Sequence, residues 1–125
     1  MFEVGVVARL RAQHHLVGDF GPASQPHGHD YRVEATVGGG SLLVDGTLLD
    51  ITILQTSLDS AIRDLDGRDL NTLEGLAQPN PTAEIVARYL FERIAPNLGG
   101  RGIRDLTLKV WESEEAFAAY SGDLN

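Results

Sequence analysis

The sequence predicts an α+β fold in which two amphipathic helices pack against a mainly antiparallel sheet. Its 125 residues fit one domain, because domains cluster at roughly 100–150 residues. The hydrophobic content of 42% is sufficient to fill a core. The periodic segments run strand, strand, helix, helix, strand, and no repeat, linker or low-complexity tract divides them. We therefore expect residues 1–125 to form a single domain.

Two strands are predicted near the start of the chain. Residues 2–16 alternate as a half-buried strand does, with one parity formed by Leu10, Ala12, His14 and Leu16. Residues 18–28 are rich in Gly, Pro, Ser and Asp, which indicates a loop. Residues 29–37 alternate again, with one face formed by Tyr31, Val33, Ala35 and Val37. Residues 38–40 are all glycine and are predicted to end this strand in a turn.

Two helices and a strand are predicted next. Residues 49–65 carry apolar side chains three or four positions apart, namely Ile51, Leu54, Leu58, Ile62 and Leu65. A second helix is predicted to start at Ala83 with Thr82 as its N-cap, and to end at Pro96 and the glycines at 99 and 100. Residues 103–111 alternate as a strand, and the acidic residues after them are predicted to be irregular, with at most one more helical turn.

The composition excludes several function classes. The chain has a net charge of −8, which argues against binding to a nucleic-acid backbone. It has no cysteine, so disulfides, thiolate zinc sites and thiol nucleophiles are all excluded. Arg9 and Arg11 interrupt the first apolar run, and no uncharged apolar stretch has the ~20 residues of a bilayer span. We therefore expect a cytoplasmic protein with no membrane partner.

The four histidines lie close together in the sequence and suggest a metal site. His27 and His29 are two residues apart, so on a strand their side chains point to the same face. His14 has the parity of the buried face of the first strand and would add a third nitrogen if the two strands pair. His15 has the opposite parity and is placed at the surface or behind the ligands. Three imidazoles with an open position make a zinc site of the catalytic type, although chance clustering in a hydrophilic loop would give the same pattern.

The chain resembles the family of 6-pyruvoyltetrahydropterin and 6-carboxytetrahydropterin synthases. The family's His-Gly-His and its first-strand pattern of alternate residues match His27-Gly28-His29 and Leu10-x-Ala12-x-His14-x-Leu16, with Leu10 in place of an aromatic residue. Further matches, in the family's order, are Gly46-Thr47-Leu48-Leu49-Asp50, Leu65-Asp66-Gly67-Arg68-Asp69-Leu70-Asn71, Asn80-Pro81-Thr82-Ala83-Glu84, Glu112-Ser113 and Tyr120.

The resemblance implies a T-fold: a four-stranded antiparallel sheet with two helices on one face. Oligomerisation joins such sheets into a barrel, commonly as a hexamer built from two trimers. The resemblance also implies Zn²⁺ bound by His14, His27 and His29. It makes Glu112 the anchor of a pterin through paired N–H donors, and it places Thr82 in contact with that ligand. Taken alone, Glu112 would be an ordinary solvated charge and Thr82 an ordinary helix cap.

The chain departs from the family where the reaction takes place. The family's mechanism on 7,8-dihydroneopterin triphosphate uses a Cys–Asp–His set beside the zinc. Here the cysteine is Ala23 and the histidine is Gly67, so Asp66 alone remains as a catalytic candidate. Losing two acid–base groups is expected to cripple the usual reaction, since each is worth roughly 10²–10⁴-fold in rate.

Three hypotheses for function follow. The first is a zinc-dependent lyase on a pterin side chain with altered or weakened chemistry. Its missing groups would be replaced by zinc-bound hydroxide or by one of Ser24, His15, Asp19, Asp69 and Arg68. The second is a non-catalytic protein that uses zinc to bind a pterin or a related purine-derived ligand. The third is a zinc hydrolase unrelated to pterins, which would leave Glu112 and residues 81–84 as coincidences.

Overall fold

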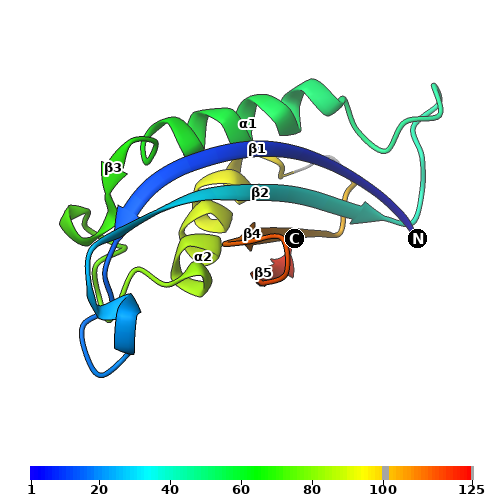
Figure 1. The fold of residues 1–125 in the computed structure, drawn as a ribbon. Coiled ribbons are helices and arrows are strands. Elements are labelled where there is room, and N and C mark those ends of the chain that lie inside the picture. The colour runs from blue at the N-terminus through cyan, green and yellow to red at the C-terminus, as the bar shows by residue number, and fades with distance from the viewer. Residues whose placement is uncertain (100–101, 125) are drawn as a thin grey trace.

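A computed structural model describes residues 1–99 and 102–124, and it shows two helices lying on one face of a curved sheet (Figure 1). The strands are β1 (Phe2–His14), β2 (His27–Gly39), β3 (Arg68–Asp69), β4 (Asp105–Trp111) and β5 (Phe117–Asp123). The helices are α1 (Ile51–Arg63) and α2 (Ala83–Ile94), with short 3₁₀ turns at η1 (Gly21–Ser24), η2 (Leu70–Thr72) and η3 (Ala95–Asn97). Neither described helix is long and apolar enough to cross a membrane.

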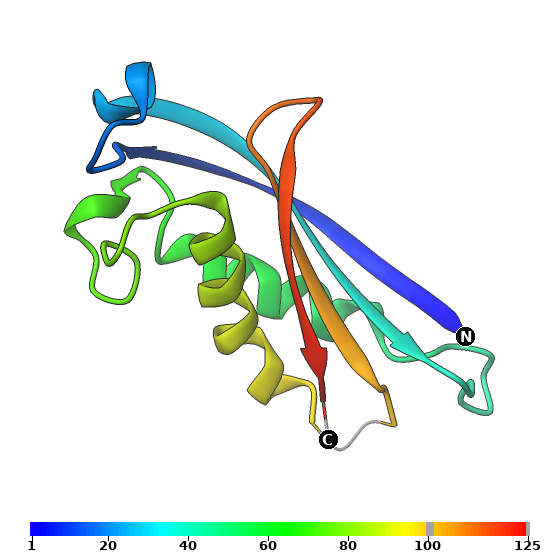
Figure 2. The same cartoon turned by 90° about the horizontal axis from the view of Figure 1, so that it is seen from below.

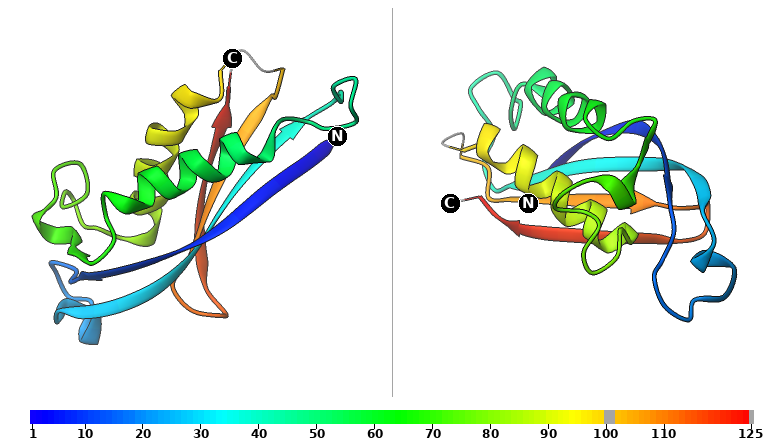
Figure 3. Two further views of the ribbon diagram at one scale, coloured as in Figure 1. Left: turned by 90° about the horizontal axis from the view of Figure 1, so that it is seen from above. Right: turned by 90° about the vertical axis from the view of Figure 1, so that its left-hand side faces the viewer.

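The sheet has the strand order β3-β1-β2-β4-β5. The pairs β1–β2, β2–β4 and β4–β5 are antiparallel, and the two-residue strand β3 runs parallel to β1. Four long antiparallel strands with two helices on one side are the T-fold that the family resemblance implies, and β3 is an addition at one edge. Helix α1 packs against β1, and α2 packs against β4 and β5. The views from below (Figure 2) and from above (Figure 3) show both helices on the same side of the sheet.

The core lies between the sheet and the helices because each long inner strand buries one parity of its residues. The buried strand residues include Leu10, Tyr31, Val33, Leu106 and Leu108. Opposite them, the helices bury Leu54, Leu58 and Ile62 from α1, and Val86, Leu90 and Ile94 from α2. The stripe predicted for α1 therefore faces the sheet from Leu54 to Leu65, whereas Ile51 at its start is exposed.

Side-chain caps start both helices. The Asp50 carboxylate accepts a hydrogen bond from the Thr52 N–H at 3.0 Å, so α1 begins at Ile51 rather than at the predicted residue 49. The Thr82 hydroxyl accepts a hydrogen bond from the Ile85 N–H at 3.3 Å, which confirms Thr82 as the N-cap of α2.

The prediction of an irregular tail is wrong, because Phe117–Asp123 forms the edge strand β5. The pairing runs from Trp111 opposite Phe117 to Asp105 opposite Asp123. The segment is mostly exposed and contains Ala, Ser and Gly, so it lacks the apolar alternation that marks a half-buried strand. Its hydrogen bonds to β4, and the contact of Tyr120 with Phe91 of α2 at a ring distance of 5.0 Å, stabilise it instead.

The predicted turn at residues 38–40 is also wrong, because β2 continues through Gly39. A Cβ at Gly38 would lie 2.5 Å from Asp105 Oδ1, and one at Gly39 would lie 2.7 Å from Leu48 Cδ1. Because these two residues have no side chain, the side chains of Asp105 and Leu48 can lie close to the backbone of β2. Other boundaries move by two residues: β1 ends at His14, β2 starts at His27 and β4 starts at Asp105.

We expect Gly39→Ala to lower the free energy of unfolding by about 1–3 kcal/mol, because the new methyl group would press on buried Leu48. Gly40→Ala is the matched control, since a Cβ there meets no heavy atom within 4 Å. Urea unfolding followed by circular dichroism would measure both. Equal stability of the two variants would contradict the packing role of Gly39.

Candidate functional site

Three histidines lie close together where β1 ends and β2 begins, beside the loop that connects these two strands. His14 lies directly opposite His27 in the antiparallel register, and His29 is two residues further along β2 on the same face. One potential ligand atom from each of the three lies within 4.8 Å of the others. Their ring centroids are 4.5 to 4.9 Å apart. The strand pairing assumed from sequence therefore brings His14, His27 and His29 into one cluster.

Main-chain carbonyls determine which nitrogen two of these rings present. His14 Nδ1 lies 2.7 Å from the Pro81 oxygen, and His27 Nδ1 lies 2.7 Å from the Gln25 oxygen. Because a carbonyl oxygen only accepts, each Nδ1 must carry the proton and donate it. Nε2 of a neutral ring then keeps its lone pair. Both rings are thus arranged as metal-ligating histidines usually are, with the other nitrogen bonded to the protein.

Burial favours the neutral form of His29. His14 is only 3% exposed, and the other two rings are half-buried. Desolvation lowers the pKa of His29, an effect that the nearby Glu112 carboxylate opposes. Neutral imidazole is the form that binds a metal ion. Three such nitrogens leave one position of a tetrahedral ion for water or substrate.

Glu112 lies beside this cluster in the same chain. It directly follows β4 and has the parity of buried Leu108 and Val110, so it belongs to the sheet face that carries the histidines. Its N–H donates to the Ala116 oxygen at 3.0 Å, which closes the turn between β4 and β5. Burial, with a contribution from the Glu112 charge, raises the pKa of Tyr31. The Tyr31 hydroxyl is buried and has no hydrogen-bond partner among the described residues.

Thr82 and Asp66 have structural partners in this structure. Thr82 caps α2, as described above, one residue after the carbonyl that binds His14. The Asp66 carboxylate accepts a hydrogen bond from the Arg11 N–H at 2.9 Å, and the Gly67 N–H donates to the Arg11 oxygen at 2.6 Å. Asp66 and Gly67 therefore satisfy the main-chain N–H and oxygen of Arg11 at the edge of β1. Contact of Thr82 with a ligand, and a catalytic role for Asp66, stay predictions.

Two of the residues proposed to replace the missing catalytic groups, Ser24 and Asp69, form hydrogen bonds with the nearby main chain. Ala23 lies in η1, and the hydroxyl of Ser24 donates to the Gly18 oxygen at 2.8 Å. The Asp69 carboxylate accepts a hydrogen bond from the Asn71 N–H at 3.0 Å and thereby caps η2. These contacts leave Ser24 and Asp69 less free to transfer a proton.

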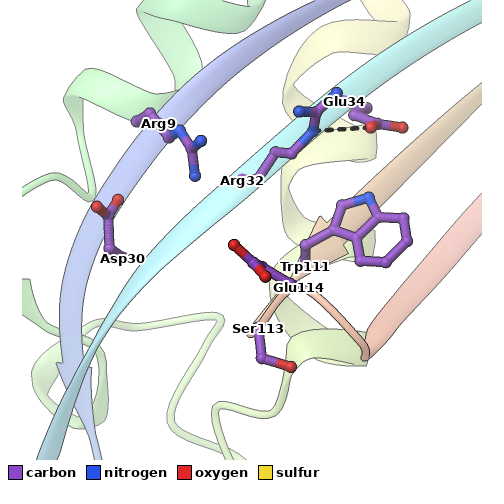
Figure 4. Close-up of a pocket in the computed structure, with 7 residues that line it drawn as sticks. All are labelled: Arg9, Asp30, Arg32, Glu34, Trp111, Ser113 and Glu114. Carbon is purple, nitrogen blue, oxygen red and sulfur yellow. Dashed lines mark hydrogen bonds and ion pairs between the residues drawn. The ribbon is translucent and has the colours of Figure 1, made fainter.

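A second hollow lies on the opposite, helix-free face of the sheet and was not predicted. Arg9, Arg32 and Trp111 lie side by side across β1, β2 and β4. Figure 4 shows them with the other lining residues, Asp30, Glu34, Ser113 and Glu114. Arg32 pairs with Glu34 at 3.0 Å, and the Trp111 indole nitrogen is buried without a partner among the described residues. The signal in the sequence is the charged parity of residues 29–37, which alternates with the apolar parity of that strand.

Comparison with known proteins assigns the chain to a family. The model of the family described as 6-pyruvoyl tetrahydropterin synthase matches residues 3–123. The chain belongs to this family. The match confirms the resemblance seen in the sequence motifs, and it places the histidine cluster and Glu112 within a pterin synthase fold.

Individual members of the pterin synthase family agree with this assignment. The dihydroneopterin monophosphate aldolase of Pyrococcus furiosus is 34% identical over 89 residues, which cover 71% of this chain and 72% of that protein. The 6-pyruvoyl tetrahydropterin synthase of Caenorhabditis elegans superposes with a TM-score of 0.82 at 22% identity, covering 97% of this chain and 95% of the other. The synthase of Plasmodium falciparum gives 0.80 at 18% identity, with 98% of each chain covered. At these identities the two structures support the fold alone.

Gly67, which stands where the pterin synthase motif has histidine, has a backbone that favours glycine. Its φ is +77°, and a Cβ there would meet no heavy atom within 4 Å. We expect Gly67→Ala and Gly67→His to lower the free energy of unfolding by a similar amount, about 1 kcal/mol, because the cost lies in the backbone rather than in contacts. Chemical denaturation of both variants, with Gly40→Ala as control, would measure this. A histidine variant as stable as the parent would show that the turn adapts without strain.

Proposed function

We propose that the protein is a zinc-dependent lyase that cleaves the side chain of a phosphorylated 7,8-dihydroneopterin, with the chemistry of an aldolase. The observation that carries the proposal is the cluster of His14, His27 and His29, in which two rings have Nδ1 bonded to main-chain carbonyls. The position of Glu112 beside that cluster and membership of the pterin synthase family support a pterin as substrate. The aldolase relative supports the reaction class.

Glu112 would hold the pterin ring. A carboxylate accepts two parallel N–H bonds from a planar donor pair, and the amino group and adjacent ring N–H of a pterin form such a pair. The half-buried position of Glu112 reduces competition from water. Binding the ring there would direct its side chain towards the nearby histidines.

The histidine cluster fits zinc. Three imidazole nitrogens on a partly buried sheet face are a usual ligand set for a catalytic zinc ion. When bound, zinc would polarise the hydroxyl groups of the side chain and lower their pKa. The residues of the chain then have to orient the pterin ring and exclude water.

An aldol cleavage needs fewer acid–base groups than a synthase reaction. The proton leaves the 2′-hydroxyl to water, the C1′–C2′ bond breaks, and C2′ departs as an aldehyde. The electron pair passes to C1′ and the conjugated C6=N5 unit of the ring, and protonation of C1′ gives a hydroxymethyl pterin. The synthase reaction instead moves protons on and off carbon, for which Ala23 and Gly67 provide no titratable group.

A non-catalytic pterin-binding protein is the second candidate. It is favoured by the structural contacts of Asp66, Ser24 and Asp69, which occupy side chains that would otherwise be available for proton transfer.

For either candidate function we infer a homo-oligomer, and a hexamer of two trimers is the expected form. The exposed edge strand β5 and the first part of β1, which β3 does not cover, leave backbone groups for pairing between copies.

Product formation tests the reaction. The zinc-loaded protein is incubated with 7,8-dihydroneopterin monophosphate, and separately with the triphosphate, and the products are followed by mass spectrometry. We expect 6-hydroxymethyl-7,8-dihydropterin, with a rate that falls at least ~10²-fold in His27→Ala and after chelation, and that returns when zinc is added back to the parent. If the zinc-loaded parent forms product no faster than His27→Ala, the lyase is contradicted and the non-catalytic pterin-binding protein is favoured.

Pterin affinity tests the anchor. We expect Glu112→Gln to weaken binding of 7,8-dihydroneopterin by about 10–100-fold, because the amide presents only one acceptor to the two donors and carries no charge. Glu115→Gln, an exposed residue three positions further on, is the matched control and should bind as the parent does. Isothermal titration calorimetry measures both. Equal affinities for the parent and Glu112→Gln would contradict the assignment of the anchor.

A further inference from the structure

Two asparagine side chains take the place of a neighbouring strand beyond the end of β1. The N–H of His15 donates to Asn71 Oδ1 at 2.9 Å, and Asn71 Nδ2 donates to the His15 oxygen at 3.0 Å. The same two bonds join Val17 and Asn80, at 2.8 and 3.2 Å. Each carboxamide therefore satisfies both main-chain groups of one residue, as a paired strand would.

These bonds continue a ladder along the outer edge of β1. Residues 12 and 13 of that edge pair with β3, and Arg11 is bonded by Asp66 and Gly67 as described above. His15 and Val17 have the same edge orientation as Arg11, since alternate residues of a strand direct their main-chain groups to the same side. The main chain on both sides of His14 is thus held from the outer edge, while β2 holds it from the inner edge.

Asn80 also controls the group that orients the His14 ring. The next residue, Pro81, is buried, and its carbonyl oxygen is the one bonded to His14 Nδ1. On the other side of that proline, the Thr82 N–H donates to the Asn80 oxygen at 2.9 Å, which closes a tight turn around Pro81. The Asn80 side chain anchors this turn to Val17, so the backbone of His14 and the carbonyl behind its ring are fixed to the same short segment.

We infer that Asn71 and Asn80 are positioning residues that hold His14 in the geometry needed to bind the metal ion. The inference rests on the proposed function, because it concerns the ligand geometry of the same zinc site. Neither side chain contacts the ion; both act through the main chain next to His14. Without Asn80 the Pro81 carbonyl loses its anchor, and the His14 ring is free to rotate or to change the nitrogen that it presents.

Metal affinity tests the inference. Metal-free parent, Asn80→Ala and Asn71→Ala are titrated with Zn²⁺ against a competing chelator, and with Co²⁺ while its visible absorption is recorded. We expect both variants to bind Zn²⁺ about 10–100-fold more weakly than the parent, the usual effect of removing a group that orients a ligand. We also expect altered Co²⁺ bands, which report ligand geometry and would not change through a loss of stability alone.

Asp50→Ala is the matched control. It removes a side chain that bonds the main chain and caps α1, and α1 begins at the end of the sheet away from the histidines, near the N-terminus in Figure 1. This variant should lower the thermal unfolding midpoint while its Zn²⁺ affinity stays within about twofold of the parent. If Asn80→Ala does not fold, Asn80→Ser, whose shorter side chain cannot make both bonds, replaces it in the titration.

The outcomes separate the two proposals. A parent that does not bind Zn²⁺ would overturn the zinc site and with it the proposed function. A parent that binds Zn²⁺, with asparagine variants that bind within about twofold of it and give unchanged Co²⁺ bands, would overturn the positioning role alone. Weakened binding in Asp50→Ala to the same extent as in Asn80→Ala would also overturn it, because general destabilisation would then explain the loss.

Discussion

The antiparallel register of β1 and β2 is the constraint on which the rest of the structure depends. It places His14 opposite His27, and the same register puts Leu10 opposite Tyr31 in the core. A slip of one residue would turn His14 to the helix-free face and expose the apolar side chains of its strand. The hydrophobic effect that selects the register therefore also assembles the histidine cluster, so that folding alone brings the three rings together.

In the proposed function, the residues for binding and the positions for proton transfer lie in different parts of the fold. The histidines and Glu112 lie in or directly after long strands of the sheet, where pairing and burial define their positions. The positions that the family uses for proton transfer lie elsewhere: Ala23 is in η1, and Gly67 is in the turn before β3. At the second position, the hydrogen bond from the Gly67 N–H to the Arg11 oxygen maintains the edge of β1, in a backbone conformation that favours glycine. The chain has thus kept the residues that rigid elements carry and replaced those that loops carry.

The sequence predicted those parts of the structure that periodicity encodes. The stripe of α1, the cap at Thr82 and the shared face of His27 and His29 follow from local patterns, and the structure confirms them. β5 could not be predicted because its stability comes from β4 and α2 rather than from its own residues. The role of the glycines of β2 could not be predicted for a related reason: it is set by contacts with Asp105 and Leu48, which only the folded chain brings against the strand. The bonds of Asn71 and Asn80 to β1 join residues more than fifty positions apart, so no local pattern contains them.

The location of Ala23 in a short turn has a consequence for how this fold diversifies. A side chain introduced there would not have to displace core atoms, and the metal ligands would keep their places in the strands. A substitution at Ala23 is then expected to change thermodynamic stability little, because η1 has no buried residue, whereas at Gly67 the φ of +77° favours glycine. Of the two positions where the family's acid–base groups are missing, the one in η1 is therefore the one that the fold leaves open to change, and the one before β3 is restricted by its backbone.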